Sequence, residues 1–480
     1  MGSAGLNSAL AKMRSAQVDE LAIEVFAHYY RLLEHGETGM IPESSIDPVD
    51  MESLADVEVA GEVAAEALRG TAIIKLNGGL GTSMGMARAK SLLCVRRGLS
   101  FLDIIARQVQ HLRRAYDAPL PLMFMNSFRT SADTMAALAR YDDLPVGDLP
   151  LEFLQNKEPK LLVKDLLPVS HPRDPSLEWC PPGHGDLYTV LHSSGLIDRL
   201  LDQGYRRVFV SNADNLGATP DPRVAGWLAA NGIPFAIEAV RRTPSDRKGG
   251  HFARRRADGR IVLRESAQTL DVDRAALADL DRHRFCSTNN LWFDLAAMKQ
   301  VLDSRQGIMG LPLIRNVKHV DPGDPTTAQV IQVETAMGAA IEIFAGARTI
   351  EVGRDRFVPV KTTNDLLVLR SDVYDIGRDY VLDQVPENIP FIELDGEYYA
   401  RVVDFDQRFP EGAPSIRAAS SLTVAGDWTF GADVSVRGEA RLERKPGAQR
   451  VLPGAVLGDG EAPPPPAERR RRSEGAGARR

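Results

Sequence analysis

The sequence predicts an α/β protein in which helices cover both faces of a mostly parallel sheet, followed by a smaller region of short strands. From Thr71 onward, short apolar runs alternate with stretches of helical spacing, an order typical of parallel sheets. Near the C-terminus, Gly426, Gly431 and Gly438 recur among apolar residues. This spacing favours a β-solenoid, with a β-meander as the alternative.

Each expected element follows from a local pattern. Apolar residues at helical spacing predict helices over residues 21–33 and 54–68. Ser100, with Asp103 three residues later, predicts the N-cap of a helix. The Ala-Asp-Gly sequence at residues 257–259 predicts the turn of a hairpin inserted on the sheet. The expected strands cover residues 71–76, 91–95, 120–125, 207–211 and 234–240, and a further helix covers residues 131–140.

These patterns divide the chain into four parts. An N-terminal helical segment is expected over residues 1–70, the α/β domain over residues 71–375 and the β-solenoid-like domain over residues 376–457. Residues 458–480 are rich in Pro and Arg and poor in apolar side chains. We expect this tail to be disordered because it has little apolar surface to bury.

Composition narrows the classes of function. The chain has 480 residues and a net charge of −7, which argues against general nucleic-acid binding through a basic face. We expect neither a membrane-spanning segment nor a signal peptide, and therefore a cytoplasmic protein. The three cysteines, Cys94, Cys180 and Cys286, have no metal-ligand spacing, so we interpret them as incidental thiols.

The most specific motif is LNGGLGTSMG, at residues 76–85, directly after the first central strand. Glycines in such a loop let several backbone N–H groups turn toward an anion. The loop is neither a Walker A motif nor a GxGxxG fingerprint. Lys90 follows it and is suited to neutralise a triphosphate, although most lysines simply lie at the surface. The sequence therefore predicts a phosphate-binding loop.

A second motif, VSNADNLGA, spans residues 210–218 and carries Asn212 and Asp214 at the end of an expected strand. A carboxylate in this position can hold Mg²⁺ between itself and phosphate oxygens. The alternative role for Asp214 is a turn or a helix cap. Asp214 is the expected metal ligand.

Three further strings carry candidate binding residues. WCPPGHGDLY, at residues 179–188, places His184 as a hydrogen-bond donor to a sugar phosphate and Gly183 where a flat base can approach. VPVKTTNDLLVL, at residues 358–369, offers Lys361 as a second cation for the phosphates. Gln155 has an amide suited to a base edge, and Asn289 and Asn290 have amides suited to sugar hydroxyls, although each of these could instead serve a turn.

Together, and in this order, the strings from about residue 54 to residue 372 resemble the UTP–glucose-1-phosphate uridylyltransferase family. The resemblance implies a Rossmann-like nucleotidyltransferase domain over residues 71–375 and a left-handed β-helix after it. It implies a UTP site formed by Leu76, Asn77, Gly78, Gly79, Lys90, Gln155, Gly183, Asp214 and Lys361. It also implies that His184, Asn212, Asn289 and Asn290 hold the sugar phosphate, that Asp214 binds Mg²⁺, and that Lys90, Lys361 and Asp214 are catalytic.

The resemblance implies transfer of a uridylyl group from UTP to glucose 1-phosphate, with release of pyrophosphate. One departure is Ala89, where the family usually has Pro, and it is expected to change loop stiffness only. The alternatives are a pyrophosphorylase for N-acetylhexosamine or several sugar 1-phosphates, and a non-catalytic regulator that binds nucleotide sugars. Thr82-Ser83-Met84-Gly85 favours glucose over the first alternative. Assembly of copies through the C-terminal domain is a further expectation.

Overall fold

The computed structural model describes residues 4–247 and 249–458. The chain forms two compact units. Of the described residues, the first contains those of 4–82, 86–359 and 376–382, and the second contains those of 83–85, 360–375 and 383–458. The predicted tail at residues 458–480 lies outside the described residues except for Gly458.

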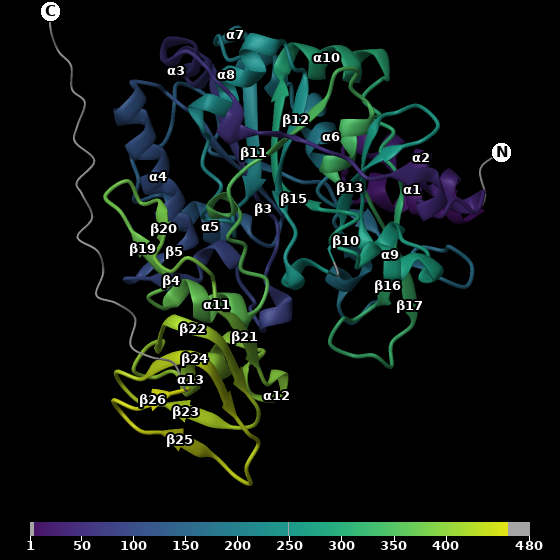
Figure 1. Ribbon diagram of the computed structural model, residues 1–480. Coiled ribbons are helices and arrows are strands. Elements are labelled where there is room, and N and C mark those ends of the chain that lie inside the picture. Colours follow the sequence, from purple (N-terminus) through teal and green to yellow (C-terminus); the bar gives the residue numbers. More distant parts are fainter. Residues whose placement is uncertain (1–3, 248, 459–480) are drawn as a thin grey trace, which may run out of the picture. The chain divides into compact units, whose positions relative to one another are not determined.

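The first unit is built on an eight-stranded sheet with the order β2-β18-β12-β15-β11-β3-β6-β7. Strand β15 (Phe285–Asp294) runs antiparallel to both of its neighbours, and the other strand pairs of this sheet are parallel. The predicted mostly parallel sheet is therefore confirmed (Figure 1). The strands are β2 (Glu52–Ser53), β3 (Thr71–Asn77), β6 (Leu122–Asn126), β7 (Glu152–Leu154), β11 (Arg207–Asn212), β12 (Phe235–Arg241), β15 and β18 (Arg348–Glu351).

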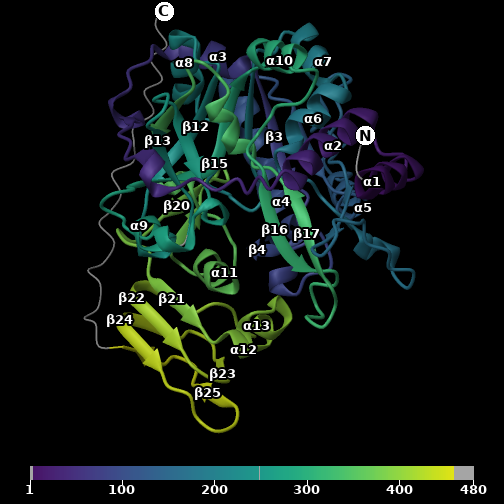
Figure 2. The ribbon, with the colours of Figure 1, turned by 90° about the vertical axis from the view of Figure 1, so that its right-hand side faces the viewer.

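Helices cover both faces of this sheet, as Figures 1 and 2 show from two directions. On one face, α6, α7 and α10 contribute Leu187, Leu200 and Met298 to a core that includes Ile74 and Val210 of the strands. Helices α3, α4 and α8 form the other group, in which α3 packs against both of the others. The helices are α3 (Gly61–Arg69), α4 (Phe101–Tyr116), α5 (Ser131–Leu138), α6 (Asp186–Ser193), α7 (Leu196–Asp202), α8 (Pro222–Asn231), α9 (Arg274–Leu277) and α10 (Leu295–Ser304).

The strands and caps follow the local sequence closely. Six of the seven residues of β3 are buried, as expected for a central strand whose two faces are both covered. Ser100 and Asp103 form the predicted capping box at the start of α4. The prediction of a helix over residues 54–68 is wrong in its first half, because Leu54–Asp56 is a single 3-10 turn and α3 begins only at Gly61. The strand predicted over residues 91–95 begins only at Cys94. It is β4 (Cys94–Arg96), which pairs with β5 (Leu99–Ser100).

The N-terminal helices belong to the first unit. Helices α1 (Ala4–Ser15) and α2 (Glu20–Glu34) share a buried cluster with Leu161 and Ile331 of two distant strands and with Leu313, which directly precedes a third. The predicted hairpin is β13 (His251–Arg255) with β14 (Ile261–Arg264), and β1 (Ile46–Asp47) adds a third strand. The remaining strands of this unit are β8 (Glu158–Pro159), β9 (Leu161–Leu162), β10 (Trp179–Cys180), β16 (Ile314–His319) and β17 (Gln329–Glu334).

The second unit has α11 (Thr363–Arg370), α12 (Gly396–Tyr399) and α13 (Val402–Arg408), followed by parallel strands. In the main sheet, β22 (Ser415–Val424) pairs with β21 (Phe391–Leu394) on one side and β24 (Ser435–Leu442) on the other. Strand β24 then pairs with β26 (Val456–Leu457), and β23 (Trp428–Phe430) pairs with β25 (Gln449–Val451). Figure 2 shows β21, β22 and β24 side by side in that order. Strands β19 (Tyr374–Ile376) and β20 (Leu382–Gln384) pair with each other.

These parallel pairings exclude the β-meander, in which neighbouring strands would be antiparallel. Among the described residues, none of the helices has both the length and the apolar character needed to cross a lipid bilayer.

The capping box at α4 yields a first prediction. Ser100 Oγ accepts a hydrogen bond from the Asp103 backbone N–H and donates one to its carboxylate. Ser100→Ala should therefore lower the free energy of unfolding by about 1 kcal/mol in urea titrations. The control is Ser15→Ala, which removes an exposed hydroxyl at the end of α1 and should leave stability within about 0.5 kcal/mol. Equal stabilities for the two variants would show that the cap contributes nothing.

Candidate functional site

A cavity of about 350 Å³ opens at the carboxyl ends of β3 and β11, where ligands collect in parallel sheets. It is lined by every residue predicted for the site except Asn290 and Lys361. The lining also includes Ser91, Met125, Pro181 and Ala213, which were not predicted but are neighbours of predicted residues or end a predicted strand. The cavity residues are Leu76, Asn77, Gly78, Gly79, Lys90, Ser91, Met125, Gln155, Pro181, Gly183, His184, Asn212, Ala213, Asp214 and Asn289.

The glycine loop leaves β3 and forms one wall of the cavity. The Asn77 side chain donates to Asn126 Oδ1 at 2.8 Å and to Thr134 Oγ1 at 2.9 Å, which anchors the last residue of the strand. Gly78 follows, and a Cβ at this position would lie 2.7 Å from Oε1 of Gln155. A side chain at position 78 would therefore push Gln155 away, so the glycine lets the two loops approach closely.

The charged pair of the cavity comes from two segments that are 124 residues apart. Lys90 Nζ lies 2.7 Å from Asp214 Oδ2, and the two side chains are 15% and 22% exposed. The pairing of β3 with β11 places Leu76 opposite Asn212, so the residues after both strands meet at one edge of the sheet. Gly78 and Gly79 of the glycine loop and Asp214 therefore line the same cavity.

His184 has one defined tautomer. Its Nδ1 accepts a hydrogen bond of 3.0 Å from the backbone N–H of Met337. Burial lowers the pKa of His184 to about 4, so the ring is neutral near pH 7 and the proton lies on Nε2. The imidazole is therefore a hydrogen-bond donor to whatever occupies the cavity.

The segment that carries His184 packs tightly on Thr335. Gly183 has a φ of +81°, and a Cβ there would lie 2.5 Å from the carbonyl oxygen of Thr335. The backbone N–H of Gly185 donates to that oxygen at 2.9 Å, and the N–H of Thr335 donates to Pro182 at 3.0 Å. Both glycines are thus required by the backbone path and the close contact.

The three asparagines at the far wall are not equivalent. Asn289 has a φ of +60° and donates to Asn212 Oδ1 at 2.9 Å, and both side chains line the cavity. Asn290 is fully buried below this surface and donates to Glu238 Oε2 at 3.0 Å. Glu238 also pairs with Arg356 at 2.6 Å. Asn290 therefore supports the wall and does not line it.

A buried lysine that sequence reasoning missed lies in β3. Lys75 donates to Ser211 Oγ at 2.7 Å and to the carbonyl oxygen of Ala218 at 2.6 Å. Burial, followed by the nearby Arg356, lowers the pKa of Lys75 to about 7. The bond to Ser211 joins β3 to β11 one residue before Leu76 and Asn212, and the bond to Ala218 reaches the segment that follows β11. The one charged residue in an otherwise apolar predicted strand was the feature of the sequence that could have identified Lys75.

Lys361 belongs to the second unit, just before α11. Its backbone N–H donates to Asp365 Oδ2 at 2.8 Å, and Thr362 and Asp365 form a capping box. Its predicted contact with the phosphates stays a prediction.

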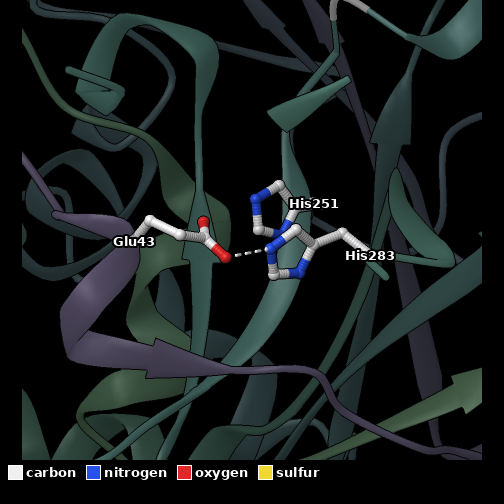
Figure 3. A group of neighbouring side chains, drawn as sticks. All are labelled: Glu43, His251 and His283. Carbon is white, nitrogen blue, oxygen red and sulfur yellow. Dashed lines mark hydrogen bonds and ion pairs between the residues drawn. The ribbon is translucent and has the colours of Figure 1, made fainter. Parts of the chain in front are cut away.

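A second cluster of titratable groups consists of Glu43, His283 and His251, the first residue of β13 (Figure 3). The two rings are stacked with centroids 3.7 Å apart, and His283 Nε2 lies 2.9 Å from Glu43 Oε1. The carboxylate is already bound by Arg264 at 2.6 Å and Arg282 at 2.7 Å. A metal cation would face two guanidinium groups, so we interpret this cluster as a structural link between the N-terminal segment and the hairpin.

The mostly parallel sheet, the glycine loop at its carboxyl edge and the lysine–aspartate pair are typical of the class of α/β proteins that bind nucleotides for phosphoryl transfer. The comparison with known families is specific. The model of the UTP–glucose-1-phosphate uridylyltransferase family matches residues 23–437, and the chain belongs to this family.

Individual relatives cover nearly the whole chain. The UTP–glucose-1-phosphate uridylyltransferase of Hordeum vulgare is 36% identical over 467 residues, which is 94% of this chain and 95% of that protein. The structure of a UDP-glucose phosphorylase from Trypanosoma brucei is 44% identical, with a TM-score of 0.90, and covers 95% of this chain and 98% of that one. A mutant of the Leishmania major UDP-glucose pyrophosphorylase in complex with UDP-glucose is 40% identical, with the same TM-score and coverage.

The buried histidines predict how stability depends on pH. Burial, followed by the neighbouring His283, lowers the pKa of His251 to about 3, so the unfolded chain binds a proton that the folded chain does not. Stability is therefore lost as the pH falls below about 6.5. In urea titrations at pH 6 and pH 5, His251→Gln should reduce this loss by about 1 kcal/mol.

The control for that experiment is His35→Gln, because His35 is exposed at the end of α2. It should keep the pH dependence of the unsubstituted protein. If His251→Gln also keeps it, His251 is not the group that resists protonation in the folded state.

Proposed function

We propose that this chain transfers the uridylyl group of UTP to glucose 1-phosphate and releases pyrophosphate, the activity for which its family is named. The observation that carries the proposal is the Lys90–Asp214 pair at the glycine loop, in a cavity that also holds Gln155 and His184. Its volume, about 350 Å³, is within the usual range for small-molecule sites.

UTP would lie along the glycine loop. Leu76 to Gly79 would contact the nucleotide, with Gln155 and Gly183 at the uracil, where the Gln155 amide can both donate and accept. His184 would donate its Nε2 proton to the sugar phosphate, and Asn212 and Asn289 would face the sugar from the opposite wall. Asn290 would act indirectly, by supporting Asn289 from below.

The donor set suits a hard divalent cation. Mg²⁺ is commonly bound by one or two carboxylates together with substrate phosphates, and Asp214 presents one partly exposed carboxylate at the cavity. Asp214 would hold Mg²⁺, and the ion would supply charge neutralisation on the phosphates when bound. Lys90 would release part of its contact with Asp214 and turn toward the phosphate oxygens.

In the reaction, an oxygen of the sugar phosphate forms a bond to the α-phosphorus of UTP while the bond from that phosphorus to the bridging oxygen of pyrophosphate breaks. The attacking oxygen is already ionised, so no protein base is required. The protein's task is to align the two substrates and to offset the negative charge that they bring together. Lys90 and, from the second unit, Lys361 are the cations proposed for this task.

For the second unit, we propose a short β-solenoid of left-handed coil. The parallel succession of β22, β24 and β26, in which Ser415 pairs with Ser435 and Ser435 with Val456, supports a coiled path. Association of copies through this unit and a cytoplasmic location stay predictions.

Asp214→Asn tests the proposed metal ligand. Loss of the negative charge should lower kcat about 100-fold or more, with the secondary structure unchanged by circular dichroism. Pyrophosphate release from UTP and glucose 1-phosphate is measured against added Mg²⁺. The control, Asp202→Asn, changes an exposed carboxylate at the end of α7 and should retain full turnover. Normal turnover of Asp214→Asn would remove Asp214 from the mechanism.

Lys361→Ala tests the proposed second cation. Removing a charge that acts on the phosphates should lower kcat at least about 100-fold, whereas Lys164→Ala, at an exposed lysine, should not. A panel of sugar 1-phosphates in the same assay distinguishes glucose from N-acetylhexosamine and from several sugars. Binding of UDP-glucose without Mg²⁺-dependent turnover by the unsubstituted protein would favour a regulator instead.

A further inference from the structure

Asp186 is a buried carboxylate beside the cavity that the reaction does not use. It is the first residue of α6, is 4% exposed and follows His184 by two positions. Burial raises the pKa of Asp186 to about 6. Burying a charge in this way is costly unless hydrogen bonds offset the lost hydration. The carboxylate of Asp186 therefore needs hydrogen-bond donors close to both of its oxygens.

Both partners are groups of one residue, Asn156. Its backbone N–H donates to Asp186 Oδ2 at 2.6 Å, and its side-chain Nδ2 donates to Asp186 Oδ1 at 2.8 Å. Hydrogen bonds to an ionised acceptor are the stronger kind, and two of them fix both position and orientation. The carboxylate therefore ties the connection between β7 and β8 to the start of α6.

That connection carries Gln155. The backbone N–H of Gln155 donates to the carbonyl oxygen of Asn126 at 2.8 Å, at the end of β6. On its other side, Gln155 is followed directly by the tethered Asn156. The Gln155 side chain then lies over Gly78, where a Cβ would approach it to 2.7 Å. Gln155 is thus held between two fixed points, one of which is Asp186.

We propose that Asp186 is a positioning residue for base recognition, which fixes Asn156 and thereby the amide of Gln155 relative to Gly183. This inference rests on the proposed function, because it takes Gln155 as the group that contacts uracil. Uracil and cytosine present reversed donors and acceptors at their pairing edges, and an amide can match either by turning over. Selection of uracil therefore depends on how firmly Gln155 is held.

A second buried acid, Glu158, lies near Asp186. Glu158, 3% exposed, lies two residues beyond Asn156. Burial, followed by the nearby Asp186 and Glu334, raises the pKa of Glu158 well above its usual range. Of the two acids, Asp186 is the one whose carboxylate accepts both hydrogen bonds from Asn156.

The direct test is Asp186→Asn in the full-length protein. The introduced amide would set a donor against one of the two donors of Asn156. The KM for UTP should rise roughly tenfold or more, and the preference for UTP over CTP in kcat/KM should fall by a similar factor. The KM for glucose 1-phosphate should change less than about twofold.

A matched control is Asp198→Asn, which alters an exposed carboxylate on the neighbouring helix α7 and should change none of these values. The alternative is that Asp186 only stabilises the N-terminal end of α6. That role predicts a lower melting temperature with an unchanged UTP-to-CTP ratio, and this result would overturn the proposal.

A rescue experiment distinguishes positioning through Asn156 from stabilisation of the end of α6, and it also applies if Asp186→Asn folds poorly. In the double variant Asp186→Asn with Asn156→Asp, the amide at position 186 can donate to the new carboxylate and still accept the backbone N–H of residue 156. This variant should recover at least half of the lost UTP preference on a logarithmic scale, although the helix end stays uncharged. No recovery would refute positioning through Asn156.

Failure of this proposal is distinguishable from failure of the proposed function. If Gln155→Ala leaves the UTP-to-CTP ratio unchanged, Gln155 does not read the base and the site assignment is wrong. If Gln155→Ala lowers the ratio and Asp186→Asn does not, the site assignment holds and only the role of Asp186 is rejected.

Discussion

The site depends on one constraint, the parallel pairing of β3 with β11 in a register that sets Leu76 opposite Asn212. Both strands end at the same edge, so their loops begin side by side although they lie far apart in the chain. The 2.7 Å contact between Lys90 and Asp214 follows from that alignment. The bond of Lys75 to Ser211 links the two strands near their ends, and its bond to Ala218 holds the segment that follows β11.

The cavity residues Gly183 and His184 are held in place by a different part of the chain, the segment that contains Thr335 and Met337. The turn from Pro182 to Gly185 is bound to the backbone of Thr335, and Met337 fixes the ring of His184. A segment more than 150 residues away thus decides which nitrogen of the imidazole carries the proton. The neutral tautomer follows from burial and from a backbone N–H, so no acidic partner is needed to orient the ring.

Much of the site could be predicted because binding residues follow strands in recognisable strings. Gly78, Asp214 and His184 each stand in such a string, and each lines the cavity. Asn289 and Asn290 show where this reasoning fails. Adjacent residues of a strand point to opposite faces, but the register shift between β12 and β15 and the positive φ of Asn289 decide which one reaches the cavity. Two adjacent asparagines in a sequence reveal neither the register shift nor the positive φ.

The sequence by itself determined the alternation of strands and helices, the glycine loop and its place after a buried strand, because these follow from spacing and backbone freedom over a few residues. The tertiary structure alone decided the packing of α1 and α2 against distant segments of the first unit, the hydrogen bond between Glu43 and His283, and the hydrogen bonds from Asn156 to Asp186. Such contacts join residues that are distant along the chain, and only the register and packing of the folded elements bring them within reach.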